Sequence, residues 1–286
     1  MPRAARRLLP VLLALSAVTA VDAAVHAPAP APVQVKGPGV TGTVIRYPSM
    51  HSTHVAPRNV DVWLPPGYGK DPARRHPVLY MHDGQNLFDP ATSYGNVDWA
   101  VDEAMTDLIA RGAVREAIVV GIWNTPARRG EYMPQRAVRG NVHFNVPGAD
   151  DLKPEDIVSD RYLAFLVEEL KPFIDATYRT LPGRADTFVM GSSMGGLISQ
   201  YAMSQYPDVF GGAGCVSTHW PAGNGIALDD FAAHLPDPAT HKYWFDYGTA
   251  TLDALYEPYQ QRADEILRKA GYVEGQNWIT RKFEGA

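Results

Sequence analysis

The stretch Gly191-Ser192-Ser193-Met194-Gly195-Gly196 decides the interpretation of this chain. The apolar run at 187–190 predicts a buried strand before it, and a helix is predicted from about Met194. Glycines on both sides of Ser193 fit a strand-to-helix turn that is too sharp for neighbouring Cβ atoms. Such a turn exposes the serine hydroxyl above a helix N-terminus, whose free N–H groups favour negative charge. We therefore expect Ser193 to be a nucleophile.

The remaining hydrophobic pattern alternates between strands and helices. Two strands with alternating polarity come first, and continuous apolar runs follow. The expected strands cover residues 43–47, 59–64, 78–81, 117–122, 187–190, 214–216, 243–247 and 278–283. Further helices are expected from about Val97, Pro154 and Tyr256. This order predicts an α/β protein with a mostly parallel, eight-stranded sheet and helices on both faces.

The N-terminal region is expected to lie outside the folded domain. Within residues 1–24, three arginines precede an apolar run at 8–21, which is typical of a secretory signal peptide and too short for a comfortable membrane span. Residues 25–40 form an Ala/Pro-rich linker, and residues 41–286 form one domain. The mature protein is then secreted or periplasmic, without a stable membrane anchor.

Composition excludes several classes of function. A net charge of −5 argues against nucleic acid or an anionic membrane as a partner. Cys215 is the only cysteine, so neither an intrachain disulfide nor a thiolate metal cluster can form. No residue pattern indicates a metal or an organic cofactor.

An acyl-transfer serine needs hydrogen-bond donors for the oxyanion. One N–H comes from the residue after the nucleophile, Met194, and another comes from the loop after the third strand. That loop is His82-Asp83-Gly84-Gln85-Asn86, in which Gly84 allows a tight turn. We expect the Gln85 N–H to be the second donor.

Three segments together resemble the putative-esterase family of α/β-hydrolases. They are residues 78–89, the turn at 191–196, and Phe245-Asp246-Tyr247-Gly248-Thr249 with Asp253 just beyond. The family includes feruloyl and acetyl xylan esterases, S-formylglutathione hydrolases, enterochelin esterases and mycolyltransferases. The resemblance extends from about residue 41 to the end. It implies an α/β-hydrolase fold and a serine carboxylic-ester hydrolase that forms an acyl-Ser193 intermediate. The substrate would be a small-molecule or glycan-linked ester, and the same motifs also suit an acyltransferase.

The family pattern places the acid of the catalytic triad after the seventh strand. A carboxylate shortly after Gly-Thr is Asp253 in this chain. Asp246 is the competing carboxylate, but it lies inside the expected strand. An N-cap for the following helix is the structural alternative for Asp253.

The general base is not found where the fold requires it. The order in this fold is serine, acid, histidine, but no histidine follows Asp253. We expect the sequence to stop short of the histidine loop and the last helix, which would leave apolar surface on the sheet uncovered. The alternative product is a catalytically impaired fragment or a pseudoenzyme.

Four further residues are candidates for the substrate pocket. His219 and Trp220 follow the sixth strand at the expected active-site edge, and we expect His219 to line the pocket rather than to replace the base. Arg128 and Arg129 lie in the loop after the fourth strand, where they would bind an acidic group or face solvent.

Overall fold

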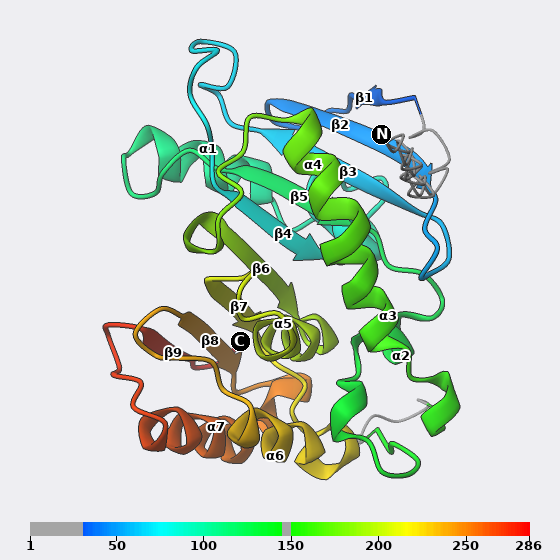
Figure 1. Ribbon diagram of the computed structural model, residues 1–286, viewed down its shortest axis with the longest axis vertical. Coiled ribbons are helices and arrows are strands. Elements are labelled where there is room, and N and C mark those ends of the chain that lie inside the picture. Colours follow the sequence, from blue (N-terminus) through cyan, green and yellow to red (C-terminus); the bar gives the residue numbers. More distant parts are fainter. Residues whose placement is uncertain (1–30, 145–149) are drawn as a thin grey trace, which may run out of the picture.

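The computed structural model describes residues 31–144 and 150–286. Its centre is one nine-stranded sheet in the order β1-β2-β3-β5-β4-β6-β7-β8-β9 (Figure 1). The strands are β1 Val33–Val35, β2 Thr43–Met50, β3 Arg58–Leu64, β4 Val78–His82, β5 Ile118–Ile122, β6 Thr187–Ser192, β7 Gly212–Val216, β8 Lys242–Gly248 and β9 Trp278–Phe283. The pairs from β5 through β4 and β6 to β9 are parallel, and β1, β2 and β3 continue the sheet in antiparallel fashion. The predicted α/β class is confirmed.

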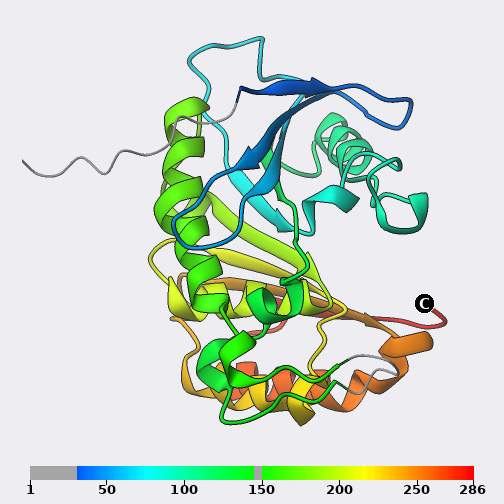
Figure 2. The same cartoon turned by 90° about the vertical axis from the view of Figure 1, so that its right-hand side faces the viewer.

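Helices lie on both faces of this sheet. They are α1 Val101–Ala110, α2 Arg128–Tyr132, α3 Ser159–Ala164, α4 Lys171–Thr177, α5 Met194–Gln205, α6 Ile226–Ala233 and α7 Glu257–Lys269. Figure 2 shows the sheet between α1 on one side and the long α3–α4 run on the other. A π-helical segment, Phe165–Leu170, makes α3 and α4 one continuous run.

The two faces of the sheet carry separate hydrophobic clusters because successive side chains of a strand point to opposite faces. Val60 and Val62 of β3 belong to the large cluster that includes residues of α3, α5 and α6. Trp63 of β3 and Val119 of β5 belong to a smaller cluster with α1. Hydrophobic clusters therefore pack on both faces of the middle strands, which carry the β6–α5 turn.

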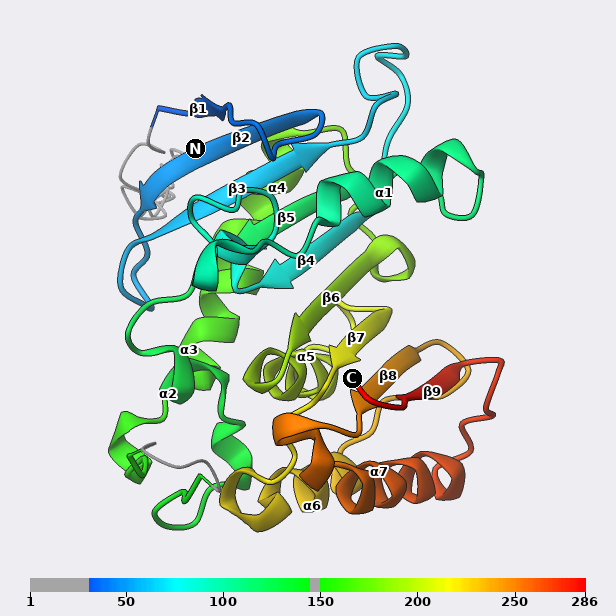
Figure 3. The same ribbon diagram turned by 180° about the vertical axis from the view of Figure 1, so that it is seen from behind.

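An apolar groove of about 490 Å³ lies between α1 and the sheet, on the face seen in Figure 3. Its lining includes Leu79, Met81, Met105, Leu108, Met190 and Val216. Trp99 at its rim is 40% exposed. Apolar surface is thus open to solvent on this face.

Some boundaries differ from the sequence-based expectation. The ninth strand, β1, lies within the segment expected to be a linker, and it pairs antiparallel with Val44–Arg46 of β2. Helix α1 begins at Val101 rather than near Val97, which is extended and 71% exposed. The Asp98 side chain accepts the Ala100 N–H, a local bond that competes with helix formation before Val101.

The helix expected from Pro154 begins at Ser159. Residues Pro154–Asp156 form a separate 3₁₀ turn, and Val158 interrupts the helical backbone. The expected signal peptide and the start of the linker lie outside the described residues. Within the described residues, every helix is too short or too polar to cross a bilayer.

Candidate active site

Ser193 occupies the turn between β6 and α5 with an unusual backbone conformation. Its φ of 60° and ψ of −117° lie where non-glycine residues are rarely found, a conformation that costs on the order of 1–3 kcal/mol. The Ser193 N–H donates to the Val216 carbonyl of β7 at 2.9 Å, which anchors the turn to the sheet. A Cβ at Gly191 would lie 2.8 Å from the Gly195 backbone, so only glycine fits there. The half-buried Ser193 side chain is therefore held at the carboxyl edge of the parallel strands.

The first turn of α5 leaves a donor beside Ser193. The N–H groups of Gly196 and Leu197 both donate to the Ser193 carbonyl oxygen, at 3.0 and 3.3 Å. Met194 is the first residue of the helix, where N–H groups have no partner within the helix. Its N–H carries the positive end of the helix dipole and suits a developing oxyanion.

The loop after β4 lies against the same helix turn. A Cβ at Gly195 would be 3.5 Å from the Asp83 Oδ2 atom, which places this loop beside the start of α5. Gly84 packs so closely on β5 that a Cβ would lie 2.4 Å from the Gly121 carbonyl carbon. The 3₁₀ turn Gly84–Asn86 bonds the Asn86 N–H to the Asp83 carbonyl, and Gln85 precedes that donor. The pairing of Met194 and Gln85 as oxyanion donors stays a prediction.

Two further contacts fix Gln85. Its side-chain Oε1 accepts the Asn124 N–H at 3.1 Å, and its carbonyl oxygen accepts the Thr92 hydroxyl at 2.8 Å. The backbone of the expected oxyanion loop is therefore held from two other segments of the chain.

Arg128 is paired within the protein. Its guanidinium donates two hydrogen bonds to the buried Asp83 carboxylate, from Nε at 2.6 Å and from Nη2 at 2.8 Å. Asn124 donates a third bond to Asp83 at 2.5 Å. Arg128 Nη2 also lies 3.5 Å from the Ser192 carbonyl oxygen. Because Asp83 already balances its charge, Arg128 holds the loop against the β6–α5 turn, a role that sequence analysis did not foresee.

Arg129 is a half-buried residue of α2. Its guanidinium stands 5.4 Å above the Phe144 ring and donates to the Asp150 carbonyl at 2.6 Å. The Phe144 ring in turn stacks on His219 at 6.1 Å. Arg129 is thus connected to the His219 side of the site through one aromatic ring.

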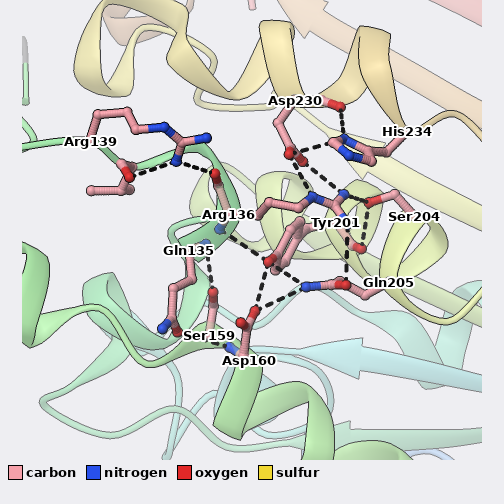
Figure 4. A network of polar contacts seen from close by, with 11 residues as sticks. Gln135, Arg136, Arg139, Ser159, Asp160, Tyr201, Ser204, Gln205, Asp230 and His234 are labelled. Atoms are coloured by element: carbon pink, nitrogen blue, oxygen red, sulfur yellow. Dashed lines mark hydrogen bonds and ion pairs between the residues drawn. The ribbon is translucent and has the colours of Figure 1, made fainter.

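The segment that follows α2 is hydrogen-bonded to α5 and α6 through Arg136 (Figure 4). Arg136 donates to both oxygens of Asp230 on α6, at 2.6 and 3.0 Å, and to Ser204 on α5 at 2.8 Å. The Arg136 N–H donates to the Tyr201 hydroxyl at 3.1 Å. This network links the region around Arg128 to α5, the helix that begins at the nucleophile.

Asp253 lies on the loop after β8, as the family pattern predicts. Its Oδ2 accepts the Ser217 hydroxyl at 2.6 Å and the Gly248 N–H at 2.8 Å. The Ala286 carbonyl accepts the N–H groups of Thr249 and Ala250, so the last strand leads to the same loop. Within the part of the chain that the structure describes, no imidazole donates to Asp253.

The competing carboxylate, Asp246, lies inside β8. It accepts the Ser217 N–H at 3.1 Å and the Trp244 indole N–H at 2.8 Å. Burial raises the pKa of Asp246 above its ordinary value, against the effect of these hydrogen bonds. Both carboxylate oxygens of Asp246 thus accept hydrogen bonds from β8 or from the residue after β7. This favours Asp253 as the candidate for the acid of the catalytic triad.

His219 and Tyr256 contact each other, and the His219 backbone is bonded to the nucleophile's own carbonyl. The His219 N–H donates to the Ser193 carbonyl at 3.1 Å, and its Nδ1 lies 2.8 Å from the Tyr256 hydroxyl. Burial raises the pKa of Tyr256 to about 12, and a hydrogen bond with the Ser193 side chain opposes this shift. Burial, with help from Arg128, lowers the pKa of His219.

Sequence reasoning found His219 but not Tyr256. The only signal was position, because Tyr256 stands three residues after Asp253 at the start of the last predicted helix. Trp220 differs from its expected place in the pocket. It is 1% exposed, packs on Phe231 and Phe245, and donates to Gln260, so it belongs to the core.

The sheet topology, the strained serine and the surrounding loops define a protein of the α/β-hydrolase fold. Over residues 52–278 the sequence matches the family described as putative esterase. The chain therefore belongs to this family, as its motifs predicted.

Curated relatives match at modest identity. The uncharacterized protein YbbA of Bacillus subtilis (strain 168) is 26% identical over 164 residues, which cover 57% of this chain and 58% of that protein. An endo-1,4-beta-xylanase/feruloyl esterase of Xylanibacter ruminicola is 26% identical over 191 residues, 66% of this chain and 22% of that protein. The matches thus span less than two thirds of these relatives.

Solved structures share the fold. A ferulic acid esterase from the anaerobic fungus Anaeromyces mucronatus has a TM-score of 0.60 at 23% identity and covers 88% of this chain and 87% of its own. The enterobactin esterase of Shigella flexneri has a TM-score of 0.57 at 20% identity, covering 82% of this chain and 52% of its own.

Proposed function

We propose that this chain hydrolyses carboxylic esters through an acyl intermediate on Ser193. The observation that carries the proposal is the backbone of Ser193, with a φ of 60° at the first turn of α5. A protein keeps such a strained residue only when the surrounding structure enforces it, and such residues gather at active sites. Membership of the putative esterase family supports the same chemistry.

In the first half-reaction, the Ser193 oxygen attacks the ester carbonyl carbon. The carbonyl oxygen becomes an oxyanion and is stabilised by the N–H groups of Met194 and Gln85. Collapse of the tetrahedral intermediate expels the alcohol, which takes up a proton, and leaves an acyl ester on Ser193. Water then attacks this ester by the same route and releases the acid. Asp253, at the end of β8, is the acid that our proposal assigns to orienting a base.

We propose a small-molecule or glycan-linked ester as the substrate. The names of the relatives support this class, since one curated relative is a xylanase/feruloyl esterase and two structural neighbours are esterases of ferulic acid and enterobactin. We further propose that residues 1–24 are a signal peptide and that the enzyme acts outside the cytoplasm. N-terminal sequencing of the exported protein tests the cleavage.

The neighbouring serine provides a matched control for the catalytic assignment. Ser192 precedes the nucleophile and is also partly exposed, but it ends β6 with strand geometry. We expect Ser193→Ala to lower the rate of p-nitrophenyl acetate hydrolysis by several orders of magnitude, leaving only the residual rate that the oxyanion donors and binding supply, whereas Ser192→Ala keeps the rate within about tenfold of the parent. Equal rates for the parent and Ser193→Ala would remove Ser193 from catalysis.

A further inference from the structure

Asp102, in the first turn of α1, is a buried carboxylate without the partner that its counterparts have. Among the described residues, the buried acidic side chains are Asp61, Asp83, Asp102, Glu131 and Asp230. All except Asp102 form an ion pair with an arginine, at 2.6 to 2.8 Å. Asp102 is 0% exposed, and no lysine, arginine or histidine of the described residues pairs with it. Because an uncompensated buried charge is costly, another group must balance it.

Two further carboxylates lie beside Asp102. One side-chain oxygen from each of Asp98, Asp102 and Glu103 lies within 4.8 Å of the other two. The Oδ1 atom of Asp102 and the Oε2 atom of Glu103 are buried, and neither has a hydrogen-bond partner within the described residues. An ionised carboxylate only accepts hydrogen bonds, so these oxygens cannot satisfy one another. Three formal negative charges therefore meet where two of the oxygens are both out of water and unpaired.

The hydrogen-bond donors that reach this cluster are neutral groups. The Thr41 N–H donates to Asp102 Oδ2 at 2.6 Å, and the Thr41 hydroxyl donates to Glu103 Oε1 at 2.8 Å. The Ala100 N–H donates to Asp98 at 3.2 Å. The N-terminus of α1 adds roughly half an elementary positive charge, which is less than three carboxylates require. Both the charge and the two unpaired oxygens call for a cation.

We propose that Asp98, Asp102 and Glu103 bind a calcium ion. Calcium takes oxygen ligands, carboxylates among them, in a flexible geometry at about 2.3–2.6 Å. Two ligands of one such ion lie up to about 5 Å apart, which fits the spacing within this cluster. Water completes the shell on the side of Asp98, which is half-buried. Magnesium suits the cluster less well because it demands a near-ideal octahedron and usually keeps several waters.

The ion would join the start of β2 to the start of α1. Thr41, two residues before β2, already bonds to two of the three ligands. The Trp99 N–H donates to the Asn86 carbonyl at 2.7 Å, and the Val101 N–H donates to the Leu87 carbonyl at 3.0 Å. The segment that carries the ligands is thus bonded to the loop after β4. Calcium bound here should stabilise the native fold.

A proton shared between Asp102 and Glu103 is the other way to balance this pair. It removes one charge and turns one oxygen into a donor. Since metal ligands must be deprotonated, a proton and calcium compete for the same oxygens. The proton therefore holds the pair together in the presence of a chelator, and calcium displaces it. The two alternatives differ in whether added calcium changes the protein.

Calcium titration of the full chain, first treated with a chelator, tests the site near neutral pH. We expect binding heat in isothermal titration calorimetry and a rise in the thermal midpoint of at least about 3 °C once calcium is well above its Kd. Asp102→Asn and Asp98→Asn should each bind calcium at least about tenfold more weakly, because affinity depends on the number of ligand charges. Asp98 is only half-buried, so its variant tests the site even if Asp102→Asn folds poorly.

Asp107→Asn is the matched control. It removes the same charge from the same helix, but the Asp107 side chain is 62% exposed and pairs with Arg111. This variant should keep the calcium response of the parent. A parent chain without binding heat or midpoint shift, or an equal shift in Asp102→Asn, would overturn the site. An equal or larger shift with magnesium would overturn the choice of calcium. These measurements are independent of ester hydrolysis.

Discussion

The strongest stability prediction concerns the buried ion pair between Arg58 of β3 and Glu131 of α2. The guanidinium donates two hydrogen bonds to the carboxylate, at 2.6 and 3.0 Å, and the two side chains are 1% and 2% exposed. The rings of Tyr162 and Phe165 lie 5.3 and 5.4 Å from the Arg58 guanidinium carbon. Glu131→Gln would leave the Arg58 charge buried beside a neutral partner.

Breaking such a pair costs about 3–5 kcal/mol, because the remaining charge stays out of water without compensation. We expect Glu131→Gln to lower the free energy of unfolding by about this amount, measured from the midpoint and slope of urea denaturation. The double variant Arg58→Met with Glu131→Leu should recover most of the loss, since a well-packed apolar pair is often neutral.

A surface pair provides the comparison. Glu265 and Lys269 on α7 are 63% and 81% exposed, and Glu265→Gln should change stability by less than about 1 kcal/mol. If Glu131→Gln costs no more than Glu265→Gln, the reasoning about the buried pair is wrong.

Three further predictions concern separate parts of the fold. Gly191→Ala should lower stability by about 1–3 kcal/mol in urea denaturation and also impair ester hydrolysis, because the new methyl group would lie 2.8 Å from the Gly195 backbone; full activity would contradict this. Burial raises the pKa of Asp102 beside Glu103 to about 7, so the folded state holds a proton that the unfolded state releases, and stability falls as the pH rises toward that value. Asp102→Asn should therefore raise the thermal midpoint more at pH 8 than at pH 5, and the opposite order would refute the assignment. Cys215 is fully buried with its pKa raised by burial, so Ellman's reagent should react with it only in urea; rapid reaction in the folded state would show that the strand is open.

The β6–α5 turn could be predicted from sequence because its requirements are those of the backbone. Gly191 and Gly195 meet at the crossing of strand and helix, and a Cβ at Gly191 would lie 2.8 Å from the Gly195 backbone, so position 191 requires glycine. The loop at Gly84 was predictable for the same reason. At these positions the local backbone geometry requires glycine, and a glycine is visible in the sequence.

Other features depend on contacts between distant segments. Strand β1 was missed because its three residues, Val33–Val35, follow an Ala/Pro-rich stretch and are too few to show a strand period; they pair through the edge that β2 offers. Trp220 was predicted to line the pocket because it follows the strand that became β7. Its packing on Phe231 and Phe245 places it in the core instead. Arg128 was expected to bind an acidic group or to face solvent, and the sequence did not indicate that Asp83, 45 residues earlier, accepts its hydrogen bonds.

Tyr256 shows the limit most clearly. Nothing in its sequence neighbourhood distinguishes it from an aromatic residue that anchors a helix. Its hydrogen bond with His219 and its place near the charge of Asp253 arise only when β7, β8 and the start of α7 come together.

The central claim is that Ser193 is the nucleophile, and covalent trapping tests it most directly. The full chain would be treated with an alkyl fluorophosphonate, digested, and mapped by mass spectrometry. The account predicts one phosphonyl adduct, located on Ser193, that is absent from Ser193→Ala and retained in Ser192→Ala. An adduct on Ser192, or none on a folded protein that still hydrolyses p-nitrophenyl acetate, would contradict it.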